Sequence, residues 1–291
     1  MFSNKLYTPL RYPGGKARFA PYITSLMEEN ELIGGHYLEP YAGGAGVALD
    51  LLFHEAAEHI HINDYDSAVY DFWITITKKP EALLKLVNDT PITMNQWFHW
   101  RAVLRGEVEV DQVERGFATL FMNRTNRSGV LKGGVIGGKD QSGTYRLDAR
   151  FKKDVLTKRI ERIAVHANKI SVYNEDALTL LKRCKSFLPK KSLIYLDPPY
   201  YVKGQGLYRN FYLHDDHVAI AEQLQKIDFE HPWIVSYDNV QEIQDMYKIA
   251  EALKYVINYT AQKRYVGSEI MFFSSQMKMS KMELPQAKLA A

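Results

Sequence analysis

The stretch HYLEPYAGGAGVALDLL, residues 36–52, predicts a short strand, a glycine-rich turn and an apolar helix. Gly43, Gly44 and Gly46 have no Cβ atom, so a ligand can approach the main chain closely at this turn. Their spacing is not the G-x-G-x-x-G of a dinucleotide site, and Glu39 stands at the end of the strand. A carboxylate there repels a pyrophosphate and attracts a cationic ligand. A turn that only packs the helix against the strand would use the same glycines.

Three later segments also have the pattern of a strand followed by polar residues. They are EHIHIND (58–64), SLIYLDPPY (192–200) and HPWIVSYDN (231–239). EDALTLLKRC (175–184) and DHVAIAEQLQKI (216–227) have helical spacing between them. Alternating strands and helices predict an α/β fold with a mostly parallel sheet, in which ligands bind outside the carboxyl ends of the strands. We therefore expect one site lined by the strand-end residues Glu39, Asp64, Asp197 and Tyr237.

The charge is unevenly distributed along the 291 residues. The net charge is +3, but residues 101–169 hold 15 Lys and Arg against 8 Asp and Glu, a local charge of +7. Such a basic block favours a polyanionic partner, although a solvated helical face also explains it. Residues 68–130 favour helix, and residues 132–146 are a glycine-rich, basic loop or hairpin. The segment RFKKDVLTKRIERI, residues 150–163, begins an apolar stripe at helical spacing. We predict a catalytic core of residues 1–67 and 165–291, interrupted by a mainly helical recognition domain at 68–164.

Composition excludes several classes of protein. No stretch approaches the length of a membrane span, and the first residues lack the apolar core of a signal peptide. The single cysteine, Cys184, rules out an intrachain disulfide and a cysteine-rich metal site, and we expect no metal. Cys184 lies outside every predicted strand end, so we interpret it as a bystander and not a nucleophile. These features favour an intracellular, cytoplasmic setting.

The strand ends suit one cationic cofactor. S-adenosylmethionine carries a sulfonium and an ammonium group, which matches the carboxylate of Glu39. Asp64 ends the next strand, where an acidic residue accepts the hydroxyl protons of a ribose. The same Asp64 is also placed to cap a helix that begins near Ser67, and the two roles are compatible.

The segment RYPGGK, residues 11–16, combines an aromatic ring, two glycines and a lysine. Lys16 is a candidate to bind the carboxylate of the cofactor, and Tyr12 to pack on it. Gly14 gives the main chain the freedom to approach a ligand. A solvent-exposed turn explains this segment equally well when it is taken alone.

The segment YLDPPY, residues 195–200, suits nitrogen chemistry. A strand that ends in two prolines needs no more than a turn to explain it. However, the exocyclic amine of a nucleobase is a poor nucleophile, and Asp197 and the carbonyl of Pro198 are placed to accept its two N–H bonds. Tyr200 is expected to stack on the base, a contact worth about 1–3 kcal/mol. Such a base must leave the duplex to be reached.

These motifs together carry a resemblance to a known family. In this order, RYPGGK, LEPYAGGAG, HIND, FMNRTNRSG and YLDPPY resemble the DNA-adenine methylases related to the bacterial Dam enzyme. SYDN (236–239) and GSEIMFF (267–273) are similar to later segments of that family, so the resemblance covers nearly the whole chain. It implies transfer of a methyl group from S-adenosylmethionine to adenine N6, on a Rossmann-like class I methyltransferase core with an inserted DNA-recognition domain. It also implies double-stranded DNA as the partner in a bacterial or phage-infected cell, and leaves open a cognate restriction endonuclease.

The resemblance also implies roles for particular residues. At the cofactor it places Tyr12, Lys16, Asp64 and Asp197, with the glycine turn lining the pocket. At the adenine it places Asp197, Pro198, Pro199 and Tyr200. Asp176, in YNEDAL, matches an acidic position that meets the adenine of the cofactor in this family.

The chain departs from the best-known Dam-like enzymes after FMNRTNRSG, so we predict no recognition sequence. Basic and polar residues in this region are expected to contact DNA, mostly at phosphates. They are Arg124, Asn126, Arg127, Lys132, Lys139 and Arg146. The 201–212 segment is expected either to cover the flipped base or to be a surface loop.

Three alternatives remain at the level of sequence. Methylation of cytosine N4 poses the same chemical problem, and motif order and the aspartate of LDPPY favour adenine. A DNA-binding protein with an inactive methylase core is disfavoured because Lys16, Asp64, Asp197 and Tyr200 are all present. A dinucleotide oxidoreductase is disfavoured by Glu39 and by the glycine spacing.

Overall fold

One mixed sheet organises the protein. The computed structural model describes residues 7–12, 16–202, 212–248, 250–259, 265–280 and 282. The strands are β1 (Gly35–Glu39), β2 (Ala57–Asn63), β3 (Ile170–Tyr173), β4 (Ser192–Leu196), β5 (Trp233–Asp238), β6 (Glu251–Tyr259) and β7 (Tyr265–Phe273). Within the described residues these seven form one sheet in the order β3-β2-β1-β4-β5-β7-β6. The first five are parallel and β7 runs antiparallel to both of its neighbours, which confirms the predicted α/β, Rossmann-like fold.

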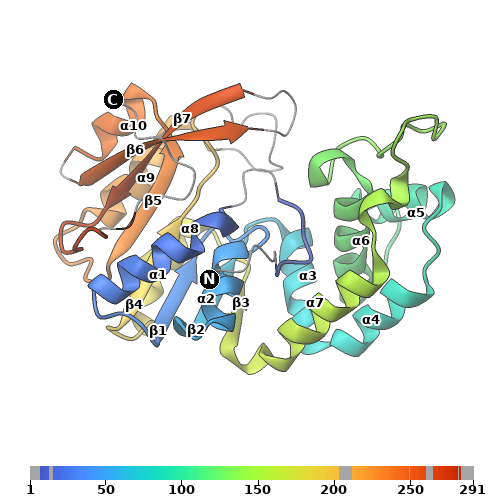
Figure 1. Ribbon diagram of the computed structural model, residues 1–291, viewed down its shortest axis with the longest axis horizontal. Helices are drawn as coiled ribbons and strands as arrows, with labels where there is room; N and C mark the ends of the chain where they lie inside the picture. The colour runs from blue at the N-terminus through green and yellow to red at the C-terminus, as the bar shows by residue number, and fades with distance from the viewer. Residues whose placement is uncertain are drawn as a thin grey trace.

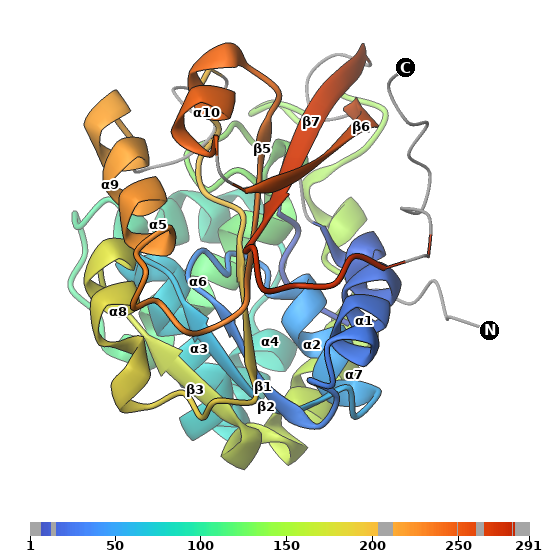
Figure 2. The ribbon, with the colours of Figure 1, turned by 90° about the vertical axis from the view of Figure 1, so that its left-hand side faces the viewer.

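Helices cover both faces of the sheet. On one side lie α1 (Ala20–Glu29) and α2 (Gly46–Phe53), and on the other α8 (Ala177–Arg183), α9 (His214–Leu224) and α10 (Gln241–Met246), as Figure 2 shows. Alternate residues of β1 point into two separate cores, Tyr37 toward the α1 side and Leu38 toward the α8 side. Tyr195 and Ile194 of β4 alternate in the same way. Strands buried on both faces explain the nearly continuous apolar runs in the sequence.

A helical insertion separates β2 from β3. It contains α3 (Ser67–Lys78), α4 (Pro80–Asp89), α5 (Met94–Leu104), α6 (Gln112–Thr125) and α7 (Lys153–Val165), and forms the right half of Figure 1. Three short 3-10 helices lie in the same part of the chain: η2 (Arg127–Gly129), η3 (Leu147–Arg150) and η4 (Ala167–Lys169). Among the described residues, two more lie outside it, η1 (Ala17–Phe19) and η5 (Cys184–Ser186). The predicted recognition domain, residues 68–164, has nearly the extent of this insertion. Its role in recognition stays a prediction.

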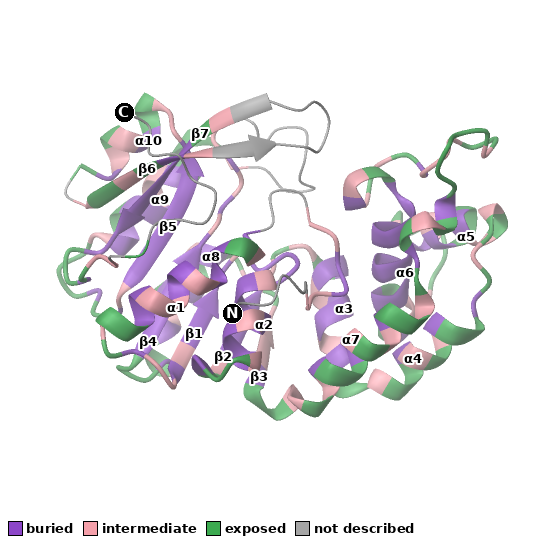
Figure 3. Cartoon of the chain, viewed as in Figure 1, coloured by how far each residue is buried: buried purple, intermediate pink, exposed green. Residues whose placement is uncertain are grey.

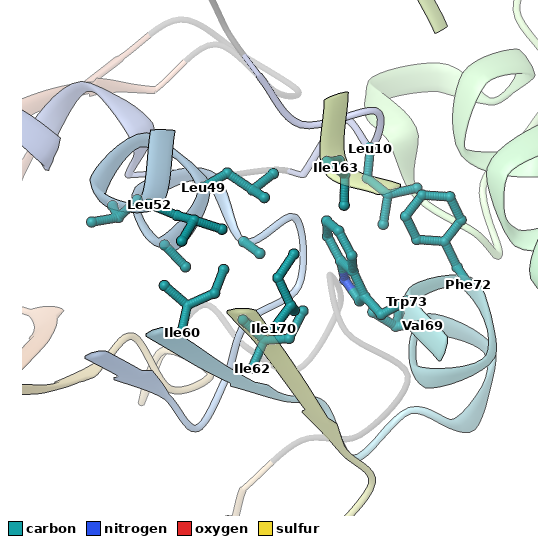
Figure 4. Packing of buried hydrophobic residues seen from close by; sticks show 14 of the residues in the cluster. Leu10, Leu49, Leu52, Ile60, Ile62, Val69, Phe72, Trp73, Ile163 and Ile170 are labelled. Atoms are coloured by element: carbon teal, nitrogen blue, oxygen red, sulfur yellow. The ribbon is translucent and has the colours of Figure 1, made fainter. Parts of the chain in front are cut away.

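The insertion and the sheet share one hydrophobic core. Trp73 of α3 and Ile163 of α7 belong to the same buried cluster as Leu49 of α2 and Ile60 of β2 (Figure 4). Figure 3 shows the same continuity, with buried residues running from the strands into α3 and α6 while α4 and α7 expose their outer faces. The apolar stripe of α7 accounts for this pattern, because it repeats at helical spacing. No helix of the described chain is long and apolar enough to span a bilayer.

Candidate active site

Carboxylates gather at the carboxyl edge of the sheet. Glu39 closes β1, and Asp64 follows β2. Asp197 follows β4, and Asp238 closes β5. Since the carboxyl ends of parallel strands share one edge, the structure brings these side chains to the same side of the sheet. The antiparallel strand β7 adds Glu269, which is the register partner of Asp238.

The glycine turn between β1 and α2 is enclosed by three side chains. Gly43 has φ +46°, and a Cβ atom built on it would lie 2.7 Å from Cε1 of Tyr12. The Gly43 amide donates to Oδ2 of Asp64 at 3.0 Å, and its carbonyl accepts from Nε1 of Trp73 at 2.9 Å. A Cβ atom on Gly44 would lie 3.3 Å from Cβ of Tyr12. Tyr12, Gly43, Gly44 and Asp64, all predicted at the cofactor, thus form one glycine cradle.

Asp64 braces this cradle and does not cap a helix. Its Oδ1 accepts from the main-chain N–H of Asp66 at 2.9 Å. Asp66 is the N-cap of α3, because its side chain accepts from the N–H of Ala68. Burial raises the pKa of Asp64 to about 7, although the hydrogen bonds from Asp66 and Gly43 oppose the shift. Each carboxyl oxygen keeps a second lone pair, which suits a hydroxyl donor such as a ribose.

Glu39 is the anchor of helix α2. It is 5% exposed, and its Oε1 accepts from the Tyr37 hydroxyl at 3.1 Å and from the N–H of Ala48 at 3.0 Å. Burial raises the pKa of Glu39 to about 8, so the carboxyl group is largely neutral at pH 7. Its attraction for a cation is therefore weaker than the sequence indicates.

Lys16 is enclosed by three acceptors at the carboxyl edge. Its Nζ donates to the Tyr200 hydroxyl at 2.6 Å and to Oε2 of Glu269 at 2.9 Å. It lies 3.5 Å from Oδ1 of Asp197. Three acceptors match the three N–H donors of an ammonium group. The predicted contact between Lys16 and the carboxylate of a cofactor does not fit this arrangement, and Gly14 of the same motif lies outside the described residues.

This buried group, here called the Lys16 network, contains Lys16, Asp197, Tyr200, Tyr255 and Glu269. Glu269 is fully buried, and its Oε2 also accepts from the Tyr255 hydroxyl at 2.6 Å. Burial disfavours the charge of Lys16, but the Asp197 and Glu269 carboxylates outweigh burial and raise its pKa. Burial raises the pKa of Asp197, and Lys16 opposes that shift. Lys16 therefore helps Asp197 to remain a carboxylate in a place that favours its protonation.

Tyr200 contacts two other members of the Lys16 network, Glu269 and Lys16. Its hydroxyl donates to Oε1 of Glu269, and the Lys16 ammonium lies 5.1 Å from the ring centroid. The residue is 6% exposed, while Pro198 is buried and Pro199 half-buried. The predicted stacking of a base on Tyr200 therefore requires the ring or its surroundings to move.

The SYDN segment holds the LDPPY motif from the neighbouring strand. Ser236 donates from Oγ to Oδ1 of Asp197 at 3.0 Å. The carboxylate of Asp238 accepts from the N–H groups of Tyr201 at 2.9 Å and Val202 at 3.1 Å. Sequence reasoning assigned neither residue a role. Most of the 201–212 segment, residues 203–211, lies outside the described residues.

Tyr237, Asp176 and Cys184 have structural roles. Tyr237 was expected at the site, and this prediction is wrong: the side chain is fully buried on the α9 face, with its hydroxyl 3.0 Å from Nδ1 of His217. Alternate residues of a strand face opposite sides of the sheet. Asp176 is the N-cap of α8 and accepts from the N–H of Thr179 at 3.0 Å. Cys184 is buried, which raises its pKa to about 11 and suits a bystander.

The predicted DNA contacts divide into two groups. Arg124 and Asn126 are wrong as DNA contacts, because both side chains lie inside the protein. Arg124 is 8% exposed and donates from Nε to the carbonyl of Pro9. Asn126 is fully buried, and its Oδ1 accepts from Nε1 of Trp97 at 2.8 Å. The exposed members are Arg127, Lys132, Lys139 and Arg146.

The donor set fits S-adenosylmethionine better than a metal. In the glycine cradle, Asp64 supplies the hydroxyl acceptor that such a cofactor requires, and Tyr12 supplies an aromatic ring beside the glycines. Among the described residues, no group of three or more His, Cys, Asp or Glu side chains is arranged to hold a metal ion.

One family of known proteins matches most of the chain. A model of the D12 class N6 adenine-specific DNA methyltransferase family matches residues 12–261. No curated protein sequence matches significantly. Similar solved structures include a proposed RNA methyltransferase from Pyrococcus horikoshii, with 10% identity, a TM-score of 0.40, and coverage of 94% of this chain and 90% of that one. A proposed class I S-adenosylmethionine-dependent methyltransferase from Listeria monocytogenes has 10% identity, a TM-score of 0.39, and coverage of 97% and 66%.

The family match covers most of the chain and includes the glycine cradle, the Lys16 side of the network and LDPPY. It favours adenine N6 over cytosine N4, which the sequence motifs alone distinguish less well. The chain therefore belongs to the D12 class of N6 adenine-specific DNA methyltransferases.

Proposed function

We propose that Asp197 accepts a hydrogen bond from the amine of an extruded adenine, and that the glycine cradle holds S-adenosylmethionine beside it. The observation that carries this proposal is the position of Asp197 at the carboxyl edge, fixed by Ser236 and facing Lys16. When bound, the cofactor supplies an electrophilic methyl group on a sulfonium sulfur. The protein supplies acceptors, orientation and exclusion of water.

The acceptors address the weak nucleophilicity of the adenine amine. Its lone pair is delocalised into the ring, and acceptance of both N–H bonds favours the pyramidal geometry that frees it. Asp197 is the first acceptor and the carbonyl of Pro198 is the second. Proline has no N–H group to compete as a donor. Lys16 favours the carboxylate form of Asp197, which is the stronger acceptor.

The substrate is proposed to be double-stranded DNA from which the target adenine leaves the stack, as DNA methyltransferases generally require. The helical insertion provides the exposed basic contacts. These are Arg127, Lys132, Lys139 and Arg146. We also propose that the protein acts in the cytoplasm of a bacterial or phage-infected cell, either alone or beside a restriction endonuclease that its methylation blocks.

Nucleoside mass spectrometry tests this function directly. Duplex DNA of mixed sequence incubated with the protein and S-adenosylmethionine should gain N6-methyladenine. Asp197→Ala should lower turnover by about 100-fold or more, while DNA affinity stays within about twofold because phosphate contacts dominate it. Ser236→Ala is the matched control, since it removes one bond to the same carboxylate and should cost about tenfold or less. N4-methylcytosine without N6-methyladenine, or an Asp197→Ala turnover within tenfold of wild type, would refute the proposal.

A further inference from the structure

Arginine side chains gather where the N-terminal segment crosses from the sheet to the inserted helices. Arg124, on α6, donates from Nε to the carbonyl of Pro9. Arg159, on α7, donates from Nη1 to the carbonyl of Thr8 at 2.8 Å, and Nη2 of Arg124 reaches the same oxygen at 3.5 Å. Two guanidinium groups therefore meet at one oxygen atom.

Two more arginines complete this arginine cluster, which contains Arg11, Arg124, Arg150 and Arg159. Burial, and then the charges of the other three, lower the pKa of Arg124 to about 9. Burial and the charge of Arg150 lower the pKa of Arg11. Both shifts have the direction that like charges at short range produce. The geometry agrees: the N–H of Arg11 donates to Oδ1 of Asn123, the neighbour of Arg124 on α6, and η3, which carries Arg150, packs against the same helix. The four arginines thus lie together around the end of α6 and form one positive site.

The cluster lacks an anionic partner within the described chain. The ion pairs of the described residues are formed by other lysines and arginines and by one histidine, and none includes a member of the arginine cluster. Nη1 of Arg11 is buried and has no hydrogen-bond partner among the described residues. Like charges in proximity and a buried donor without an acceptor are both unfavourable. This pattern indicates a site built to receive an anion.

The position of the cluster indicates which anion. Arg11 directly precedes Tyr12 of the glycine cradle, and Arg124 lies shortly before the exposed Arg127. Leu10 packs beside Ile163 in the core shared by the sheet and the insertion, which fixes this segment (Figure 4). Arg150 is exposed, and Arg11 and Arg159 are half-exposed, so a ligand can reach them. The cluster therefore lies between the cradle and the segment proposed to contact DNA.

We propose that Arg11, Arg150 and Arg159 together bind one phosphodiester group of the DNA, while Arg124 holds the Thr8–Arg11 segment in place. The planar guanidinium forks match the two non-bridging oxygens of a phosphate. The identity of the ligand rests on the proposed function. The carboxylate of the cofactor is the other anion available nearby, and the experiment separates the two.

The first measurement is the salt dependence of DNA binding. Fluorescence anisotropy of a labelled duplex, at several NaCl concentrations, gives the slope of log K against log salt. The double variant Arg11→Ala/Arg150→Ala should lower the magnitude of this slope by about one, because a single phosphate contact is lost. A fall of about two would assign a separate phosphate to each of the two arginines and overturn the shared site. Lys158→Ala, which removes an exposed charge beside Arg159 on α7, is the matched control and should keep the wild-type slope.

The second measurement is thermal unfolding without DNA. Removing two members of an unpaired positive cluster should leave the melting temperature unchanged or raise it. Inorganic phosphate should raise the melting temperature of the wild type more than that of the double variant. A double variant that melts lower, with the same response to phosphate as wild type, would make the cluster purely structural and overturn the proposal.

The affinity for S-adenosylhomocysteine separates the remaining outcomes. A double variant that loses this affinity and keeps the wild-type salt slope assigns the cluster to the cofactor and overturns the proposal. A reduced slope with unchanged affinity for S-adenosylhomocysteine supports it. If the wild type transfers no methyl group to DNA but still shows the slope difference, the proposed function fails while the anion site stands.

Discussion

The hydroxyl of Tyr200 donates a hydrogen bond of 2.5 Å to Oε1 of Glu269, a residue 69 positions further along the chain. The other carboxyl oxygen of Glu269 accepts from Lys16 and from the Tyr255 hydroxyl. A fully buried carboxylate requires such partners, because a buried charge without them is strongly unfavourable. Glu269 thus fixes both the aromatic end of LDPPY and the ammonium group that faces Asp197.

Replacing this buried carboxylate tests the network. Glu269→Gln keeps the shape of the side chain and removes the charge that compensates Lys16. We expect the free energy of unfolding to fall by about 2–4 kcal/mol, as when one partner of a buried pair is removed. We also expect kcat to fall by about 10–100-fold with little change in KM, because Lys16 loses the carboxylate that fixes it and no longer holds Asp197 in position. Urea unfolding and tritiated methyl transfer measure the two effects.

Tyr255→Phe is the control for this variant. It removes one donor to the same carboxylate and leaves every charge in place, so it should cost about 1 kcal/mol of stability and leave kcat near wild type. If Glu269→Gln keeps both the wild-type kcat and the wild-type urea midpoint, the network has no role in positioning.

The strand ends of the site are predictable because they depend on local patterns. Short apolar runs followed by an acid identify Glu39, Asp64 and Asp197, and the geometry of a parallel sheet brings such ends together. The same argument failed for Tyr237. Successive side chains at the end of a strand point to opposite faces of the sheet, and the sequence alone does not tell which of them faces the site.

The Lys16 network depends on contacts that no local pattern contains. Strand β7 enters the sheet between β5 and β6, and this non-sequential order brings Glu269 beside LDPPY. One signal was present: Glu269 is a single acid inside the apolar run of GSEIMFF, and a charge there must be paired if it is buried. The partner of Lys16 could not be predicted, since lysine binds a cofactor carboxylate and a protein carboxylate equally well. Arg124 and Asn126 failed because a helix end rich in polar residues looks the same whether it faces DNA or a folded segment.

A substitution in the glycine cradle should separate strain from cofactor binding. Gly43→Ala places a Cβ atom at φ +46° and 2.7 Å from the Tyr12 ring. The left-handed conformation alone should cost about 1–2 kcal/mol of stability. Displacement of Tyr12 should also weaken S-adenosylhomocysteine binding by about tenfold or more, as measured by calorimetry.

Gly106→Ala is the matched control for the cradle. Gly106 has φ +73°, and a Cβ atom on it meets nothing within 4 Å, so only the strain of the backbone should remain. A loss of affinity in Gly43→Ala, with wild-type affinity in Gly106→Ala, supports the cradle as the cofactor site. Wild-type affinity in Gly43→Ala removes Gly43 from that site.

A histidine cluster on β1 and β2 should make stability depend on pH. Nδ1 of His36 lies 3.0 Å from Nε2 of His61, and His59 packs against both rings. Burial, and then the charges of His59 and His36, lower the pKa of His61 to about 3 from an unfolded value near 6.5. Below pH 6.5 the unfolded chain therefore binds a proton that the folded chain refuses. The contribution of His61 is complete above pH 6.5 and is lost by about 1.4 kcal/mol per pH unit as the pH falls.

Glu39 and Asp64 change the stability of the protein with pH in the direction opposite to His61. The effect of His61 is therefore measured as a difference between wild type and a variant. The raised pKa values of Glu39 and Asp64, about 8 and about 7, reduce stability at high pH, and this loss is recovered on acidification. Comparing wild type with His61→Gln cancels their effect. Between pH 6.5 and 5 the urea-derived stability of wild type should fall relative to the variant by about 1.4 kcal/mol per pH unit. Parallel pH profiles would show that His61 titrates normally in the folded protein.

Two neighbouring residues after helix α6 should respond in opposite ways to truncation. Asn126 is fully buried: its Oδ1 accepts from Trp97, and its Nδ2 donates to the carbonyls of Val130 and Leu131 at 3.0 Å. Asn126→Ala leaves these buried groups unpaired and should lower the free energy of unfolding by about 2–3 kcal/mol. Its salt slope for DNA binding should match wild type when measured well below the melting temperature.

Arg127 is exposed, so Arg127→Ala should leave the urea midpoint unchanged and lower the magnitude of the salt slope by about one. Asn126 and Arg127 are neighbours in the chain, and they differ in that Asn126 is buried and Arg127 is exposed. An Asn126→Ala protein of wild-type stability that binds DNA more weakly would restore Asn126 as a DNA contact. An unchanged slope in Arg127→Ala would remove Arg127 from the phosphate contacts.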